Sequence, residues 1–190
     1  MATDSQPRLV LWDIGHTLIE TRGVGRAVYE RIFPVATGQP LRELATVHGR
    51  TELDIMHGPL LAHGIEPNAQ IIERLAAALA GGYRSAIDAL TERGRVLPGV
   101  WQALCTLADE PGTHQGVLTG NTTEVARIKI EAFGLDRYIA PSLGAYGDDL
   151  GAAGATVIFR TLEDVSGLRH ALRNHGQFDA GRGMSCTDNF

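Results

Sequence analysis

The first element that the hydrophobic pattern predicts is a short apolar run, Leu9–Trp12, which ends at Asp13. A continuous apolar run of this length, followed by a glycine at position 15, is typical of a buried strand of a parallel sheet that leads into a loop. Asp13 is therefore predicted to lie at the carboxyl end of a strand.

From about Val24 to Leu90 the pattern changes, and apolar residues recur with helical spacing, as at Val28, Ile32 and Val35. Glycines and prolines divide this stretch into several short helices. Because nothing in it indicates a strand, the stretch is predicted to be a helical insertion.

A second strand-to-helix unit follows at Gly116–Leu118, where the strand is predicted to end at Thr119 and Gly120 and Asn121 to begin a helix. Such units build parallel sheets, and ligands of open α/β sheets bind outside the carboxyl ends of the strands. Asp13 and Thr119 are therefore predicted to converge from neighbouring strand ends.

The pattern weakens beyond Tyr138, where a glycine-rich stretch precedes a predicted strand at Thr156–Phe159 and a predicted helix around residues 165–172. The last residues, 174–190, are polar and aperiodic, and we expect a disordered tail there.

These elements predict an α/β fold with a doubly wound, Rossmann-like parallel sheet. Residues 1–22 and 91–173 would form the core domain, and residues 23–90 the inserted helical domain. An unpaired sheet edge and exposed apolar surface both favour association, so a homodimer is a further expectation.

Composition narrows the partners and the compartment. The chain has 190 residues and a net charge of −5, which argues against nucleic-acid binding because that activity usually needs a basic patch. No run of about 18 apolar residues indicates a membrane span. The two cysteines, Cys105 and Cys186, have neither disulfide-scaffold nor zinc-site spacing, so a reducing, cytoplasmic location is expected.

Two segments carry a resemblance to a known family. LVLWDIGHTL resembles the first motif of the haloacid dehalogenase superfamily, and VLTGN resembles its second motif. GRTELDI, VLPGV and ARIKIEAFGLDRYI are similar to the phosphoglycolate-phosphatase-like branch, and the helical stretch is similar to the α-helical cap of that superfamily. The resemblance covers roughly residues 8–146. It implies a Mg²⁺-dependent hydrolase that acts through an aspartyl-phosphate.

The resemblance assigns Asp13 as the nucleophile, which agrees with the chemistry of a carboxylate fixed at a strand end. The Thr119 hydroxyl and the backbone N–H groups of Gly120 and Asn121 would bind the phosphoryl oxygens. In the family, Mg²⁺ is held by the nucleophile and by the backbone carbonyl two residues later, which here belongs to Gly15.

The chain departs from the family at the general acid, because Gly15 stands where the phosphatases of the family carry a second Asp. Loss of a general acid or base typically costs about 10²–10⁴-fold in rate. His16 could substitute for the acid, or it could be a loop histidine without a catalytic role; the second interpretation is favoured because a shift by one residue redirects the side chain.

The remaining site residues have two interpretations each. Lys129, the only lysine, would be the family's phosphate-neutralising lysine, but it lies about 15 Å along a helix axis from the site, which favours a solvated helix position. Asp148 and Asp149 could complete the metal site or could form a turn. Arg50 could contact an anionic substrate group or could be an exposed helix-start arginine.

The sequence therefore predicts a Mg²⁺-dependent phosphatase for a small phosphorylated metabolite. Two alternatives remain open. A haloacid dehalogenase would tolerate Gly15 because expulsion of a halide needs no proton, and a catalytically silent relative would only bind a ligand.

Overall fold

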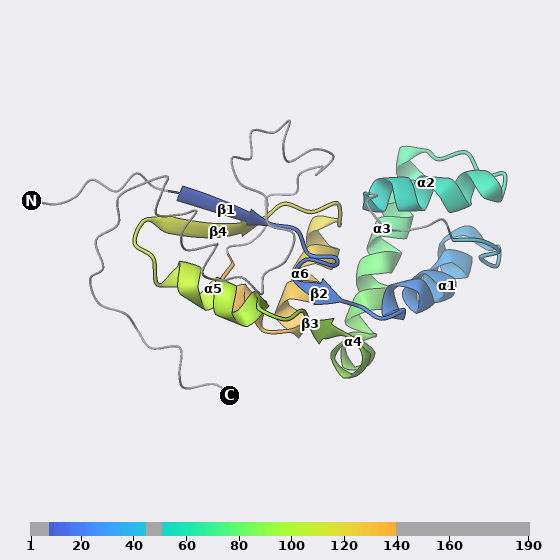
Figure 1. Cartoon of the computed structure of the whole chain (residues 1–190). Helices are drawn as coiled ribbons and strands as arrows, with labels where there is room; N and C mark the ends of the chain where they lie inside the picture. The colour runs from blue at the N-terminus through green and yellow to red at the C-terminus, as the bar shows by residue number, and fades with distance from the viewer. Residues whose placement is uncertain (1–7, 45–50, 140–190) are drawn as a thin grey trace, which may run out of the picture.

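The computed structural model describes residues 8–44 and 51–139. Strands β1 (Arg8–Trp12) and β4 (Thr113–Val117) lie side by side and run parallel, in register from Arg8 opposite Thr113 to Trp12 opposite Val117 (Figure 1). Because side chains alternate along a strand, Val10 and Trp12 pack inward, whereas Leu9 and Leu11 stay exposed on the other face. The fold is therefore α/β with a parallel sheet, as the apolar runs predicted.

In the described part of the stretch between the first two strands and β3 there are four helices: α1 (Val24–Thr37), α2 (Glu52–Ala62), α3 (Ala69–Arg84) and α4 (Ile87–Arg93). Side-chain caps start two of them, because Thr51 accepts a hydrogen bond from the Asp54 N–H and Asn68 accepts one from the Ile71 N–H. These helices share one apolar cluster. They form the right-hand part of Figure 1.

A two-residue antiparallel pair joins this helical part to the sheet. Strand β2 (Ile19–Glu20) pairs with β3 (Arg95–Val96), and the Arg95 guanidinium lies 2.9 Å from a Glu20 carboxylate oxygen. Two residues are too few to show alternation, so the sequence carries no strand signal at this pair. Helix α5 (Val100–Ala108) follows and packs against the sheet.

Helix α6 (Thr123–Ala132) stands between the two apolar clusters. Val125 and Ile128 belong to the helical cluster, whereas Ala126 and Ile130 belong to the cluster of the sheet and α5. A short 3₁₀ helix, η1 (Leu135–Arg137), follows α6. One face of α6 therefore packs against the helical part, and another packs against the sheet and α5.

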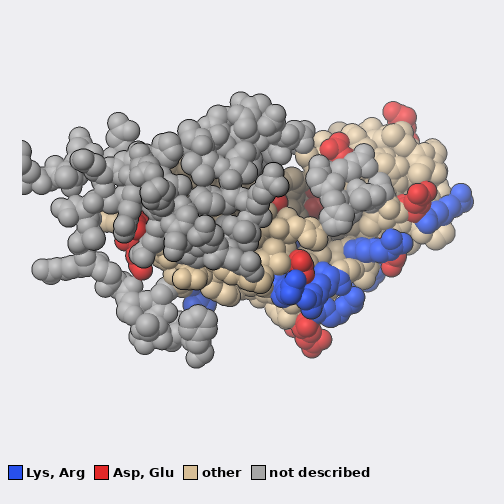
Figure 2. All heavy atoms as spheres, in the orientation of Figure 1, with Lys and Arg blue, Asp and Glu red and all other residues tan. Residues whose placement is uncertain are grey.

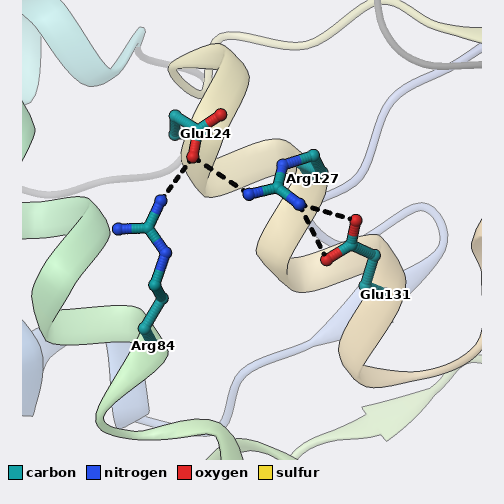
Figure 3. A network of polar contacts seen from close by, with 4 residues as sticks. All are labelled: Arg84, Glu124, Arg127 and Glu131. Carbon is teal, nitrogen blue, oxygen red and sulfur yellow. Dashed lines mark hydrogen bonds and ion pairs between the residues drawn. The ribbon is translucent and has the colours of Figure 1, made fainter.

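On the face of the helical part that Figure 2 shows, basic and acidic side chains are interspersed. One ion-pair network there joins α3 to α6: Arg84 pairs with Glu124, Glu124 with Arg127, and Arg127 with Glu131 (Figure 3). All four side chains are about half exposed, so each pair contributes little to stability.

Cys105 lies in α5 and Cys186 lies outside the described residues, so the expectation about the two cysteines stays a prediction. The predicted strand and helix beyond residue 139 and the tail 174–190 lie outside the described residues. In the part of the chain that is described, none of the helices has the length and apolar character of a membrane span.

Candidate active site

The two strand ends that the sequence singled out meet in the structure. Asp13 directly follows β1, and the Leu118 N–H donates to the Trp12 carbonyl at 2.9 Å, which extends the pairing to the last residue before Thr119. The Thr119 side chain is buried, with 3% of its surface exposed, and it hydrogen bonds to the half-buried Asp13 carboxylate. The convergence of these two residues is therefore a feature of the fold.

The carboxylate of Asp13 lies in a mixed environment. Burial raises its pKa above the ordinary value, and this is the largest influence on it. Hydrogen bonds and the charge of Lys129 act in the opposite direction. The hydrogen-bonding partners are the Ile14 backbone and the hydroxyls of Thr119 and Thr17, the last at 3.5 Å from Asp13 Oδ2.

The loop after Asp13 is a tight turn that closes on itself. The His16 N–H donates to the Ile19 carbonyl and the Ile19 N–H to the Ile14 carbonyl, at 2.9 and 3.0 Å. His16 is exposed and takes a left-handed conformation, with φ at 60°, which is uncommon for a residue with a side chain. Gly15 is also exposed, and a Cβ added to it would meet nothing within 4 Å.

Lys129 is buried at the site, although its distance along the helix favoured a solvent-exposed position. Only 8% of its surface is exposed, and its ammonium group donates to Asn121 Oδ1, so the interpretation as a solvated helix position is wrong. Side chains on a helix lean toward its amino terminus, and the long lysine side chain bridges the two turns that separate it from the strand end.

A chain of hydrogen bonds leads from this ammonium group to the carboxylate. Asn121 Nδ2 donates to Thr119 Oγ1 at 2.7 Å, while Asn121 Oδ1 accepts from Lys129. A hydroxyl has one proton and two lone pairs, so Thr119 can accept from Asn121 and still donate to Asp13. Four predicted site residues thus form one connected group.

The backbone of the loop is held from the helical part. Helix α6 begins at Thr123 with Thr122 as its cap, so the expectation that Gly120 and Asn121 begin the helix is wrong by three residues. The Gly120 carbonyl instead accepts from the Glu52 N–H at 2.7 Å. Because the C=O and N–H of a trans peptide point in opposite directions, this bond directs the Asn121 N–H away from α2. That N–H donates to Thr119 Oγ1 at 3.4 Å.

Glu52 was not among the residues that sequence reasoning selected. Its side chain is buried, with 6% exposed, and it accepts a hydrogen bond of 2.6 Å from the Tyr29 hydroxyl. Burial, together with the Glu52 carboxylate, raises the pKa of Tyr29 well above its ordinary value, so the phenol stays protonated and donates. A tertiary contact between two helices leaves no signal in local spacing. The one available signal was that Glu52 lies in GRTELDI, a segment that carries the family resemblance.

The described residues offer two oxygen ligands for a divalent cation. These are the Asp13 carboxylate and the Gly15 carbonyl, which takes part in none of the backbone hydrogen bonds that close the turn. Mg²⁺ is commonly bound by one or two carboxylates with water and substrate phosphate as its other ligands, so this donor set fits it. Within residues 8–44 and 51–139, no three His, Cys, Asp or Glu side chains gather as a metal cluster. Asp148, Asp149 and Arg50 lie outside the described residues.

Comparison with known proteins supports the fold. Neither protein-family models nor curated protein sequences match the chain. A predicted phosphoglycolate phosphatase from Haemophilus somnus is structurally similar, with a TM-score of 0.50 and 14% identity, over 90% of this chain and 72% of that one. A hydrolase from Pseudomonas syringae is similar with a TM-score of 0.52 and 21% identity, over 76% of this chain and 63% of that one.

A HAD-superfamily hydrolase of subfamily IA from Geobacter sulfurreducens also matches, over 78% of this chain and 67% of that one, at 16% identity. Its TM-score of 0.40 is too low to carry an argument. The chain spans somewhat less than two thirds of the Pseudomonas protein. The two stronger matches show that the chain shares the α/β fold of the Haemophilus and Pseudomonas proteins.

Proposed function

We propose that this protein is a Mg²⁺-dependent phosphatase that acts on small phosphomonoesters through Asp13. The observation that carries the proposal is the connected group of Asp13, Thr119, Asn121 and Lys129 at two adjacent strand ends. It combines a fixed carboxylate, a buried hydroxyl and a buried cation, which are the parts that attack on an anionic phosphoryl group needs.

Each residue has a separate role in the proposed reaction. Asp13 attacks phosphorus and forms an aspartyl-phosphate, while the bond from phosphorus to the ester oxygen breaks and the leaving group departs as the anion. Thr119 and the Asn121 N–H would hold phosphoryl oxygens, while Lys129 offsets their negative charge in a site where little solvent screens it. Water then hydrolyses the aspartyl-phosphate and regenerates the carboxylate.

Asp13 and the Gly15 carbonyl would hold Mg²⁺, which when bound supplies charge that offsets the repulsion between carboxylate and phosphate. The pKa of Asp13 supports the need for this charge. Burial outweighs the combined effect of Lys129 and the hydrogen bonds, so the residues of the protein leave the carboxylate charge incompletely compensated.

Gly15 leaves the proposed reaction without the usual acid for the leaving group. We therefore expect the phosphatase to favour substrates whose leaving groups need no protonation. The same feature favours a second candidate function, a haloacid dehalogenase, because a halide leaves as the anion.

The proposal is tested by release of inorganic phosphate from p-nitrophenyl phosphate, with Mg²⁺ and with excess EDTA. Asp13→Asn should abolish release, and Lys129→Met, which keeps the length and apolar stem of the side chain, should lower kcat by about 10²–10³-fold. Arg127→Gln, a change on the exposed face of α6, is the matched control and should leave kcat unchanged.

Equal background rates for the wild type and Asp13→Asn would exclude the phosphatase. Chloride release from short haloacids, again compared with Asp13→Asn, would then identify the dehalogenase. A protein that is inactive in both assays would be a catalytically silent relative.

A further inference from the structure

The last buried residue of α3, Tyr83, contacts the only lysine of the chain. The Lys129 ammonium lies over the Tyr83 ring, with Nζ 4.8 Å from the ring centroid. Within that distance, the negative face of an aromatic ring attracts a cation, and the attraction is larger when both groups are removed from water. Tyr83 has only 3% of its surface exposed, and Lys129 has 8%.

The ring of Tyr83 is held in a close-fitting position. An ideal Cβ built on Gly25 of α1 would come within 2.8 Å of the Tyr83 hydroxyl oxygen, so the absence of a side chain at Gly25 makes room for this hydroxyl. The ring is therefore a fixed surface against which the flexible lysine side chain can be placed.

We propose that Tyr83 is a positioning residue for Lys129, and that the helical part of the molecule thereby sets the place of the cation in the active site. A lysine ammonium has three N–H donors on a stem with four rotatable bonds. Asn121 Oδ1 accepts from one of them, and the Tyr83 ring occupies a second side. Asn121 also donates to Thr119, so these two contacts hold the ammonium at the end of the hydrogen-bonded chain that leads toward Asp13.

The proposal rests on the proposed function for its effect on turnover, but the contact itself can be tested without activity. Because Lys129 is the only lysine, protein labelled with [¹³C]lysine gives a single set of Cε–Hε signals in NMR spectra. The ring current of Tyr83 should move the Hε signal upfield of that of free lysine. No assignment of overlapping lysines is needed.

Three variants separate the ring from other contacts between α3 and α6. Tyr83→Phe keeps the ring and removes the hydroxyl, whereas Tyr83→Leu removes the ring and keeps an apolar side chain. Arg84→Gln removes the neighbouring contact from α3 to α6, the ion pair with Glu124 at 2.5 Å (Figure 3), and leaves the ring in place. Circular dichroism verifies that each variant is folded, and Tyr83→Met replaces Tyr83→Leu if the latter does not fold.

The expected result is an upfield Hε signal in the wild type, Tyr83→Phe and Arg84→Gln, and a signal near that of free lysine in Tyr83→Leu. With Mg²⁺ and p-nitrophenyl phosphate, kcat should fall about tenfold in Tyr83→Leu, which is the equivalent of a partly desolvated cation–π contact. In the other two variants kcat should stay within twofold of the wild-type value.

A wild-type Hε signal in Tyr83→Leu would overturn the proposal, and so would a shifted signal with unchanged kcat. If the wild type has no Asp13-dependent phosphatase activity, the proposed function fails instead. The position of the Hε signal in the four proteins then decides whether Tyr83 positions the ammonium.

Discussion

Replacement of Gly15 by Asp should increase turnover of phosphate esters with poor leaving groups. The backbone tolerates the change, because a Cβ at Gly15 would meet nothing within 4 Å and the residue does not have a positive φ. Gly15 is exposed and lies two residues after Asp13 in the turn, so an added carboxyl group remains close to the nucleophile without displacing a core side chain.

The size of the gain follows from what the acid does. A positioned general acid typically contributes about 10²–10⁴-fold, equivalent to about 3–5 kcal/mol of barrier. An alkoxide leaving group needs this proton, whereas p-nitrophenolate leaves without it. We therefore expect Gly15→Asp to raise kcat/KM for an alkyl phosphate by at least about 10²-fold and to change that for p-nitrophenyl phosphate by much less.

The assay compares phosphate release from glycerol phosphate and p-nitrophenyl phosphate in the wild type, Gly15→Asp and Gly15→Asn. The Asn variant has nearly the same shape and no acidic proton, so it controls for any effect of an added side chain on the turn. Equal rates for the Asp and Asn variants on glycerol phosphate would refute the reasoning, because the missing acid would then not limit turnover.

Two further predictions concern stability. Since burial raises the pKa of Asp13, the folded protein binds this proton more tightly than the unfolded chain and loses stability as pH rises through and above 3.8. The melting temperature of Asp13→Asn minus that of the wild type should therefore increase from pH 3 to pH 7. A difference that is the same at both pH values would contradict this. In α3, a Cβ at Gly82 would lie 2.7 Å from Val28 Cγ1 and 2.8 Å from Ile32 Cγ2, whereas one at Gly81 meets nothing. Both Ala variants gain helix propensity, so the difference between them reports the cost of overpacking at Gly82. In urea unfolding, the free energy of unfolding of Gly82→Ala should be lower than that of Gly81→Ala by about 1–3 kcal/mol. Equal free energies of unfolding would show that α1 and α3 adjust without cost.

Much of the fold could be predicted because its signals are local. The run Leu9–Trp12 and the run before Thr119 are short, apolar and bounded by turn residues, and both are strands that pair in parallel. The helical spacing from Val24 to Leu90 corresponds to four helices in the described part of that stretch. The convergence of Asp13 and Thr119 followed from topology alone, since parallel strands bring their carboxyl ends to one edge.

Lys129 shows where an argument from spacing fails. The distance of about 15 Å was counted along a helix axis from Thr119, but α6 begins only at Thr123, and the lysine side chain extends back toward the start of the helix. The relevant distance is between side-chain ends, and the structure places the ammonium group on Asn121. A count of residues therefore overestimated the separation.

The contacts that the helical part makes with the site could not be predicted. Glu52 reaches Gly120 through its backbone N–H, and Tyr83 reaches Lys129 through its ring. Both contacts depend on how α2 and α3 pack against the loop and α6, which periodicity does not report. The two-residue strand β2 likewise has no pattern of its own.

Among the described residues, Gly15 is where the chain departs from the phosphatase pattern that the sequence resembles. The groups that handle negative charge are present and connected, from Asp13 through Thr119 to the buried Lys129. At position 15, where the resemblance places the acid that protonates the leaving alcohol, Gly15 has no side chain and the space beside it is open. A defect confined to the leaving-group step predicts normal formation of the aspartyl-phosphate from activated esters and slow reaction of alkyl esters, which is the pattern that the Gly15→Asp comparison measures.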